Sequence, residues 1–314
     1  MGDLETTLKR ARQMSWERFG KRLTVYLPGM FSYNGLSGNY PALSITGRHC
    51  ALQCDHCRGT TLEPMISAET PVRLVEKSLR LAEKGNEGVL ISGGCDQEGR
   101  LPWEIFVPAI REIKRKTDLY ISIHCGLLDD QIARRLKQAG VDQALIDVIG
   151  DDDTYRRVYN VPFGVSRIIS TLQSLERATL PVVPHIVCGL HFGRIKGEKK
   201  AIEIISRFDV EHVVIVSLMT IPGTPLWGTP TPSAEEIAGI IAETRIRMPR
   251  ARISLGCARQ RGDTRLEILA IDAGVNRMAL PSEEALKRAG DYGLEIRYQR
   301  TCCSISLDAS KENW

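Results

Sequence analysis

Three cysteines in one short segment are the residues of this chain best suited to do chemistry. Cys50, Cys54 and Cys57 follow directly after a short apolar run that we expect to be a strand. Thiolates at this spacing on one loop can hold three irons of a [4Fe–4S] cluster. Because no fourth cysteine stands nearby, the fourth iron is predicted to bind a substrate or cofactor, like the open position of a catalytic zinc site.

Zinc ligation and simple burial are the alternative interpretations of these three cysteines. A zinc ion needs a fourth ligand, for which His56 is available, but His56 is adjacent to Cys57 and simultaneous ligation is awkward. The chain has nine cysteines, an odd number, and no secretion signal. We therefore expect reduced thiols rather than a disulfide framework.

The overall composition is that of an ordinary globular protein. The chain has 314 residues, of which 43% are hydrophobic and 25% are charged, and its formal net charge is +4. This balance excludes wholesale disorder and fibrous repeats, and the charge is too small to indicate a nucleic-acid surface. No apolar stretch reaches membrane-spanning length, and the first residues do not resemble a signal peptide. We expect a cytoplasmic protein with no nucleic-acid or membrane partner.

Short β-branched apolar runs alternate with stretches of helical periodicity along most of the chain. Eight such units predict an α/β fold, a closed (β/α)8 barrel of the TIM type. An open doubly wound sheet is the alternative, but no Gly-x-Gly-x-x-Gly opens a helix after the first strand. The predicted strands are 42–45, 88–92, 120–124, 144–149, 182–189, 213–219, 252–255 and 277–280. The predicted helices are 71–84, 103–116, 130–139, 165–178, 198–208, 234–248, 263–273 and 283–289.

The barrel is predicted to have a short extension at each end and no internal linker. Residues 1–40 form a helical extension and a loop, residues 41–290 form the barrel, and residues 291–314 form a tail with a short strand at 294–299. The chemistry of such barrels sits in the loops at the carboxyl ends of the strands. The cysteine segment lies in the first of these loops.

The pattern Cys-x3-Cys-x2-Cys, with His56 before the last cysteine, resembles that of the radical S-adenosylmethionine (radical SAM) superfamily. The resemblance implies that the open iron binds the methionyl amino and carboxylate groups of S-adenosylmethionine. Reduction by a low-potential electron donor then cleaves the cofactor, and the resulting 5′-deoxyadenosyl radical abstracts hydrogen from an unactivated carbon.

A second motif of the same superfamily lies at the end of the second predicted strand. Ser92, Gly93 and Gly94 resemble its Gly-Gly-Glu segment, whose backbone binds the methionyl amine. Cys95 occupies the position at which Glu is commoner. The resemblance therefore implies a backbone contact with the cofactor and leaves the side-chain contact open.

Further cofactor contacts are implied at the ends of later strands. Asp147 and Asp151 are placed to contact the ribose hydroxyls, although an aspartate there is often a helix cap. Segment 185–190 resembles the superfamily's Gly-x-Ile-x-Gly segment beside adenine, with a histidine in place of the first glycine. Cofactor contacts are expected there, and at the end of the sixth strand, from Cys188, Gly189 and Leu218.

Among familiar members, biotin synthase is similar to residues 42–290, but the cysteines of its second cluster do not align here. This chain has Cys257 after the seventh strand and the pair Cys302–Cys303 in the tail. That pattern resembles biotin-synthase homologues that act as one half of a two-protein lipoyl synthase. The resemblance implies a second [4Fe–4S] cluster, consumed as the sulfur source, on these three residues. An inert tail is the alternative.

The resulting hypothesis is a radical SAM sulfurtransferase that inserts sulfur at C8 of a protein-bound octanoyl group. Its partners would be an octanoylated lipoyl-carrier protein, a second radical SAM lipoyl synthase component and an electron donor. The alternatives are a biotin-synthase-like enzyme acting on a free small molecule, and a non-catalytic iron–sulfur or zinc-binding protein. Cys95, Cys125 and Cys188 are interpreted as small buried hydrophobes, and His124, His185 and His191 as residues of the barrel wall.

Overall fold

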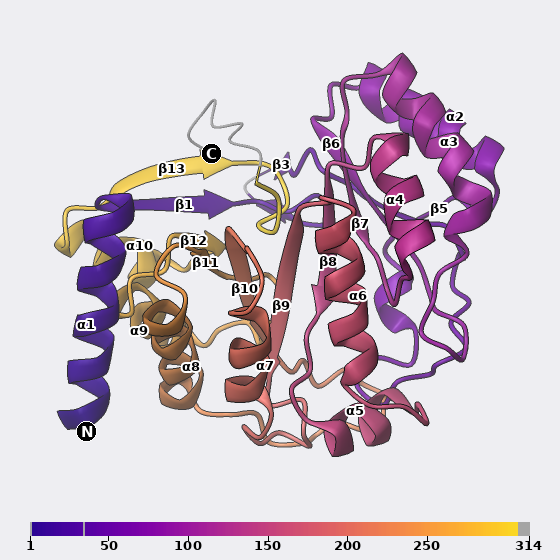
Figure 1. The fold of residues 1–314 in the computed structure, drawn as a ribbon. Coiled ribbons are helices and arrows are strands. Elements are labelled where there is room, and N and C mark those ends of the chain that lie inside the picture. Colours follow the sequence, from indigo (N-terminus) through magenta and orange to yellow (C-terminus); the bar gives the residue numbers. More distant parts are fainter. Residues whose placement is uncertain (1, 34, 307–314) are drawn as a thin grey trace.

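The structure is a computed structural model that describes residues 2–33 and 35–306, and its centre is one parallel sheet (Figure 1). Each strand pairs with its neighbours in parallel register. The strands, in sheet order, are β13 (Glu295–Gln299), β1 (Arg22–Tyr26), β12 (Arg277–Ala279), β11 (Arg252–Leu255), β10 (His212–Ser217), β9 (Val182–Cys188), β8 (Gln143–Asp147), β7 (Tyr120–His124), β6 (Gly88–Ser92), β4 (Ala42–Ser44) and β5 (Ile66–Ser67). A small antiparallel hairpin, β2 (Ser32–Tyr33) and β3 (Leu36–Ser37), lies between β1 and β4 in the chain.

Helices cover the outer face of the curled sheet (Figure 1). Several helices begin at side-chain caps such as Thr70 and Ser233, which accept hydrogen bonds from backbone N–H groups of the first turn. The helices are α1 (Gly2–Phe19), α2 (Pro71–Glu83), α3 (Trp103–Lys116), α4 (Asp130–Ala139), α5 (Asp152–Tyr159), α6 (Ser166–Arg177), α7 (Glu198–Ile205), α8 (Ala234–Arg247), α9 (Thr264–Asp272) and α10 (Glu283–Asp291), with a 3-10 turn at Thr60–Leu62. No helix in the described part of the chain is long and apolar enough to cross a membrane.

The predicted α/β barrel architecture of the TIM type is confirmed, and each of the eight predicted strands is present with slightly shifted ends. The sheet is not closed by a ladder, however, because no pairing among the described residues joins its edge strands β5 and β13. A backbone hydrogen bond of 2.7 Å from Asn39 to Arg300 links the two sides of this seam.

The sheet also extends beyond the eight predicted strands. Strand β1 lies within the predicted N-terminal extension, and β13 lies within the predicted tail, yet the two pair with each other over five residues. β1 was missed because it is short and begins with an arginine after a long helix. The sheet therefore continues across both predicted domain boundaries, at residues 40 and 290.

The sheet buries side chains on both of its faces. Strand β10 is buried at every position, as expected for a parallel strand covered by helices on one side and enclosed by the curl on the other. An inner apolar cluster faces into the curl. It consists of Leu145, Val183, Val214 and Val216. The walls of the interior are therefore largely hydrocarbon.

A buried ion pair holds the loop that follows β11. Arg259 is 2% exposed, and its guanidinium donates to Glu267 at 2.6 Å and to the Ala279 carbonyl at 2.7 Å. Glu267 also accepts from the backbone N–H of Ser282 at 2.7 Å. The pair thus connects the β11 loop, which carries Cys257, to β12 and to the start of α10.

We expect Glu267→Ala to lower the free energy of unfolding by about 3–5 kcal/mol, because it leaves the Arg259 charge buried and unpaired. Urea denaturation followed by circular dichroism measures this change. The matched control is Glu176→Ala, which removes an exposed carboxylate and should change stability by less than about 0.5 kcal/mol. Equal effects of the two substitutions would contradict a structural role for the pair.

Candidate active site

The carboxyl ends of the strands surround a cavity of about 370 Å³ inside the curled sheet. Cysteines reach this cavity from two sides. The first cysteine group, Cys50, Cys54 and Cys57, lies on the loop after β4. The second cysteine group, Cys257, Cys302 and Cys303, comes from the loop after β11 and from the C-terminal segment. Each loop reaches the cavity because parallel strands end at the same edge of the sheet.

The loop after β4 is tightly folded around the first cysteine group. The Cys54 carbonyl accepts hydrogen bonds from the backbone N–H groups of Cys57 and Arg58, at 3.1 and 2.8 Å. Cys54 and Cys57 are buried, and Cys50 is half-buried. This local folding follows from the sequence spacing and turns all three thiols toward one cavity, as predicted.

Electrostatics in the loop favour a thiolate at Cys57. A hydrogen bond from the Cys54 thiol, and a further one from His56, lower the pKa of Cys57 to about 4 despite burial. The same bond, together with burial, raises the pKa of Cys54 above its ordinary value. Since the thiolate is the form of cysteine that binds metal, the loop is already set to present a ligand.

The residues present fit an iron–sulfur cluster with a bound cofactor. The donors are cysteines, the usual ligands of such clusters. Beside them, the buried Nδ1 of His56 has no hydrogen-bond partner among the described residues. Burial opposes a charge on His56, but its bond to Cys57 and nearby negative charges raise its pKa. A buried polar atom left without a partner at the cavity wall suits a site that receives a polar ligand.

The glycine turn after β6 packs against the cysteine loop. The Gly94 N–H donates to the Thr46 hydroxyl at 2.6 Å, and the Ala51 N–H donates to the Cys95 carbonyl at 2.7 Å. A Cβ atom on Gly94 would lie 2.0 Å from the His49 carbonyl oxygen, so no larger residue fits. Ser92, Gly93 and Gly94 line the cavity, where the resemblance placed them.

Asp147 also lines the cavity, at the end of β8. One of its oxygens lies 3.6 Å from Nε2 of His124, and the other accepts a hydrogen bond of 3.3 Å from the Tyr159 hydroxyl. Burial raises the pKa of Asp147, but the bond to His124 and the neighbouring histidines outweigh it and hold the pKa below its ordinary value. The cavity therefore contains one ionised carboxylate that is oriented by two side chains.

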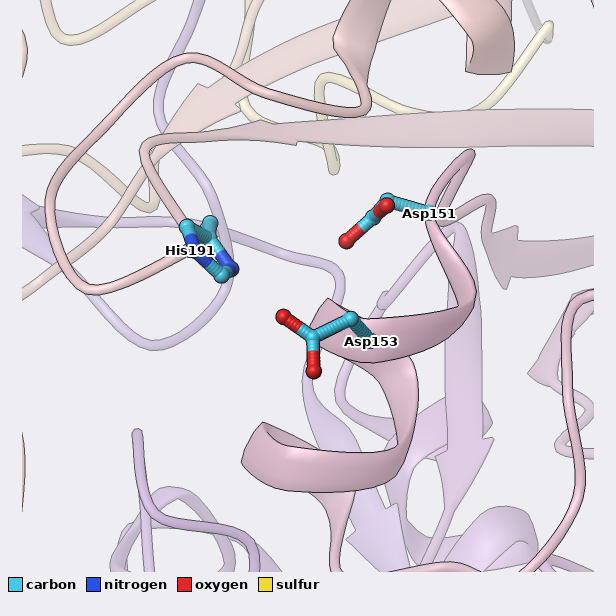
Figure 2. A group of neighbouring side chains, drawn as sticks. All are labelled: Asp151, Asp153 and His191. Atoms are coloured by element: carbon cyan, nitrogen blue, oxygen red, sulfur yellow. The ribbon is translucent and has the colours of Figure 1, made fainter.

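Asp151 is used differently from the prediction, since it does not line the cavity. It caps α5, accepting from the Thr154 N–H at 2.8 Å and from the Thr154 hydroxyl at 2.6 Å. Figure 2 shows Asp151 with Asp153 and His191, a grouping whose atoms lie close enough for one metal ion. The Lys196 ammonium lies 3.1 Å from the first carboxylate and 2.9 Å from the second, and the Arg157 guanidinium lies 3.7 Å from the second, so two cations already balance the two carboxylates.

The segment predicted to contact adenine is only partly at the cavity. His185 and Val187 line it, so the alternation of a strand turns Cys188 to the opposite face, where it is fully buried under the helices. Gly189 also lies outside the lining, with its N–H donating to the buried Glu198 at 2.7 Å. Leu218 lines the cavity as expected.

Of the other strand-end cysteines, Cys125 behaves as a small buried group whereas Cys95 is half-buried, and one aromatic residue of the site was missed. Cys125 is fully buried, and burial raises its pKa to about 12. Cys95 reaches the cavity, but burial raises its pKa as well. Tyr159 on α5 was not predicted, because a tyrosine at a helix end resembles a core residue. Its ring lies 5.1 Å from the His56 ring.

The second cysteine group is brought together by the C-terminal segment. The Cys257 thiol donates a hydrogen bond to Cys303, which raises the pKa of Cys257. Cys303 in turn donates to Cys302, which lowers the pKa of Cys302 despite burial. The predicted meeting of the tail with the end of the seventh barrel strand is therefore present in the structure.

Comparison with protein families gives two matches. Residues 44–195 match the radical SAM superfamily, and residues 215–305 match the Biotin and Thiamin Synthesis associated domain. The first match contains the first cysteine group and the second match contains the other. Successive parts of the chain are therefore similar to the radical SAM superfamily and to the Biotin and Thiamin Synthesis associated domain.

Individual relatives agree with this assignment. The chain is 26% identical over 238 residues to biotin synthase of Burkholderia cenocepacia, covering 73% of this chain and 67% of that protein. It is 27% identical over 250 residues to biotin synthase of Halorhodospira halophila, covering 76% and 74%.

Two solved structures share the fold. Methylornithine synthase (PylB) superposes with a TM-score of 0.62 at 19% identity, over 99% of this chain and 84% of that one. The FeFe-hydrogenase maturase HydG from Carboxydothermus hydrogenoformans superposes with a TM-score of 0.65 at 17% identity, over 94% and 72%.

Replacing Cys50, Cys54 and Cys57 together with Ala should abolish reductive cleavage of S-adenosylmethionine, because no thiolate then remains to hold the first cluster. Chromatography of 5′-deoxyadenosine formed under dithionite measures the loss. Cys125→Ala, a buried cysteine outside the cavity lining, is the control and should retain cleavage. Continued formation of 5′-deoxyadenosine by the triple variant would refute the site.

The His124–Asp147 pair predicts a pH-dependent contribution to stability. Burial alone would lower the pKa of His124, but its bond to Asp147 raises the pKa above the ordinary value. The stabilisation is therefore fully present below about pH 6.5, and it is lost as the pH rises through the folded-state pKa. His124→Gln should reduce the free energy of unfolding more at pH 6 than at pH 9.

Denaturant titrations of both proteins at the two pH values measure this difference. His49→Gln, which changes an exposed histidine, serves as the control and should show no such trend. A loss in His124→Gln that is the same at both pH values would show that the pair does not titrate with folding.

Proposed function

We propose that this enzyme inserts sulfur into an unactivated C–H bond of an alkyl chain. The observation that supports the proposal is a single cavity with a cysteine group on each of two sides and an apolar wall between them. Two thiol sets in one cavity suit a reaction that needs both a radical generator and a sulfur source. The known chemistry of the radical SAM domain accounts for the first of these needs.

The first cysteine group would hold the radical SAM [4Fe–4S] cluster. When bound, this group and S-adenosylmethionine supply one-electron cleavage that generates a carbon radical. The protein's own contribution is to orient and enclose. Gly93 and Gly94 allow close approach of the backbone, and Asp147 offers an oriented carboxylate to hydroxyl donors.

The second cysteine group would hold a second [4Fe–4S] cluster, which we propose as the sulfur donor. Within it, Cys303 is hydrogen-bonded to both Cys257 and Cys302. Arg259, paired with Glu267, donates to the Gly256 carbonyl, and Arg261 donates to the Cys257 carbonyl, so the loop that carries Cys257 is held in place. The positions of Cys302 and Cys303 depend on the C-terminal segment.

The composition of the cavity wall favours a neutral, chain-like substrate. Its lining contains leucine, valine and methionine side chains, but no lysine or arginine among the described residues. A free carboxylic acid bound there would lack a strong cationic partner, which is costly in an apolar site. An acyl chain attached through an amide carries no such charge. We therefore place a protein-bound octanoyl group first among the substrates, with insertion at C8.

This substrate implies three partners. The octanoyl group would be presented on the lysyl arm of a lipoyl-carrier protein, and a second radical SAM lipoyl synthase component would complete the other insertion. A low-potential electron donor would reduce the first cluster. A long, thin arm suits an enclosed cavity reached from the loop face of the barrel.

A free small molecule is the second candidate substrate. It is favoured by the names of the curated relatives, which are biotin synthases. The two candidates share the radical chemistry and the sulfur insertion, so they differ only in what enters the cavity. An assay with an octanoyl-lysyl peptide and with dethiobiotin, each with S-adenosylmethionine and dithionite, separates them.

We expect thiolated octanoyl peptide and no biotin from the wild-type protein, as measured by mass spectrometry. Biotin formation alone would move the assignment to the small-molecule candidate. Cleavage of S-adenosylmethionine with neither product would argue against sulfur insertion into both substrates.

Replacing Cys257, Cys302 and Cys303 with Ala should separate the two tasks. The variant should hold about four irons instead of about eight, the loss of one four-iron cluster. It should still cleave S-adenosylmethionine but give no thiolated product. Iron analysis, 5′-deoxyadenosine and product mass measure these effects. Full iron content would show that these residues do not hold the second cluster and would make Cys95 the next candidate ligand.

A further inference from the structure

The C-terminal segment, residues 300–306, runs into the interior of the curled sheet. Thr301 and Ile305 are 0% exposed, and Cys303 and Ser304 are 1% and 4% exposed. The segment follows β13 and contains neither helix nor strand. One turn, in which the Ile305 N–H donates to the Cys302 carbonyl at 3.2 Å, pairs two of its backbone groups. Its other buried backbone groups need partners from the barrel.

Gln143 supplies two of these partners from the start of β8. Its side chain is fully buried. The amide nitrogen donates to the Ser304 carbonyl at 2.6 Å, and the amide oxygen accepts from the Ser306 N–H at 2.9 Å. The Tyr120 hydroxyl donates to the same oxygen at 3.2 Å, which fixes the orientation of the amide. One side chain thus holds the C-terminal segment at two points.

Three more barrel residues form hydrogen bonds with the C-terminal segment. Arg277, buried at the start of β12, donates to the Ile305 carbonyl. The Ser254 hydroxyl donates to the Cys303 carbonyl at 3.4 Å. His185 Nε2 lies 2.9 Å from the Ser304 hydroxyl. Every residue from 303 to 306 therefore has at least one polar group bonded to the inside of the barrel.

We propose that Gln143 and Arg277 are positioning residues for the second cysteine group. They fasten the C-terminal segment inside the barrel and so place Cys302 and Cys303 against Cys257. The inference rests on the proposed function only for the cluster that the three thiols would hold. The attachment of the C-terminal segment by Gln143 and Arg277 concerns residues of this chain alone.

The chemistry of the contacts argues against a simple apolar plug. Burying an amide and a guanidinium is costly unless each is hydrogen-bonded. Here both side chains are hydrogen-bonded to backbone groups of one short segment. Leucine or methionine at these positions would fill the space but leave those backbone groups unpaired. Directed polar contacts instead define one position of the segment along the barrel axis. The adjacent thiols need such a fixed position if they are to share a cluster with a loop from another strand.

The test uses Gln143→Met in the metal-free protein, where maleimide labelling of each cysteine is followed by peptide mass spectrometry. Methionine keeps the length of the side chain but removes both hydrogen bonds between residue 143 and the C-terminal segment. Labelling of Cys303 should accelerate about tenfold or more, because losing a buried hydrogen bond favours local opening of the segment. Cys188, buried in the outer core, should stay slow. Gln131→Met on the exposed face of α4 is the matched control and should change neither rate.

A second variant, Ser306→Pro, removes the backbone N–H that donates to the Gln143 amide oxygen and leaves the barrel unchanged. It should also accelerate labelling of Cys303, so the proposal remains testable if Gln143→Met unfolds and exposes Cys188. After reconstitution, either folded variant should hold about four irons, against about eight in the wild type, and still cleave S-adenosylmethionine.

The outcomes separate this inference from the proposed function. Protection of Cys303 in both variants, or full iron content with a released segment, would overturn the positioning role. Wild-type protein with only about four irons would overturn the second cluster of the proposed function. Accelerated labelling in the variants of such a protein would still support the fastening of the segment by Gln143.

Discussion

The rest of the site depends on one constraint: polar groups enclosed in an apolar interior must be paired. Inside this curled sheet the wall is hydrocarbon, so the polar side chains there are matched to partners, with His56 Nδ1 as an exception. Asp147 has His124 and Tyr159, and His185 has Ser304. Such pairing fixes the side chains before any ligand arrives. It also explains why Cys54 is hydrogen-bonded to Cys57, and Cys303 to Cys257 and Cys302.

The fold was predictable to the extent that its signals are local. Eight apolar runs alternating with helical periodicity were sufficient for the barrel architecture, because each unit repeats the same pattern. The first strand, β1, was not predictable in this way. Its five residues resemble a loop after a helix, and only pairing with β12 and β13, both near the far end of the chain, makes them a strand. The open seam of the sheet is likewise a property of long-range pairing.

The site shows the same division between local and distant information. The first cysteine group was predicted because its spacing lies within one loop, and the glycine turn because it follows a strand directly. Asp151 and Cys188 were placed less well. An aspartate at a strand end is equally suited to cap the next helix, and a shift of one residue along a strand changes the face on which a side chain lies. Gln143 carries no sequence signal, since its partners lie in a segment that only the fold brings near.

The curl of the sheet is what allows two cysteine groups to share one cavity. In the sheet order, six strand-to-strand steps separate β11 from β4. In a flat sheet, steps of about 4.8 Å would place their loops about 29 Å apart. Curling brings both loops to the same small cavity. The seam follows from this geometry, because the sheet needs to curl only far enough for the first loop to face the second. The C-terminal segment enters beside that seam and supplies the two cysteines that no loop of the barrel provides.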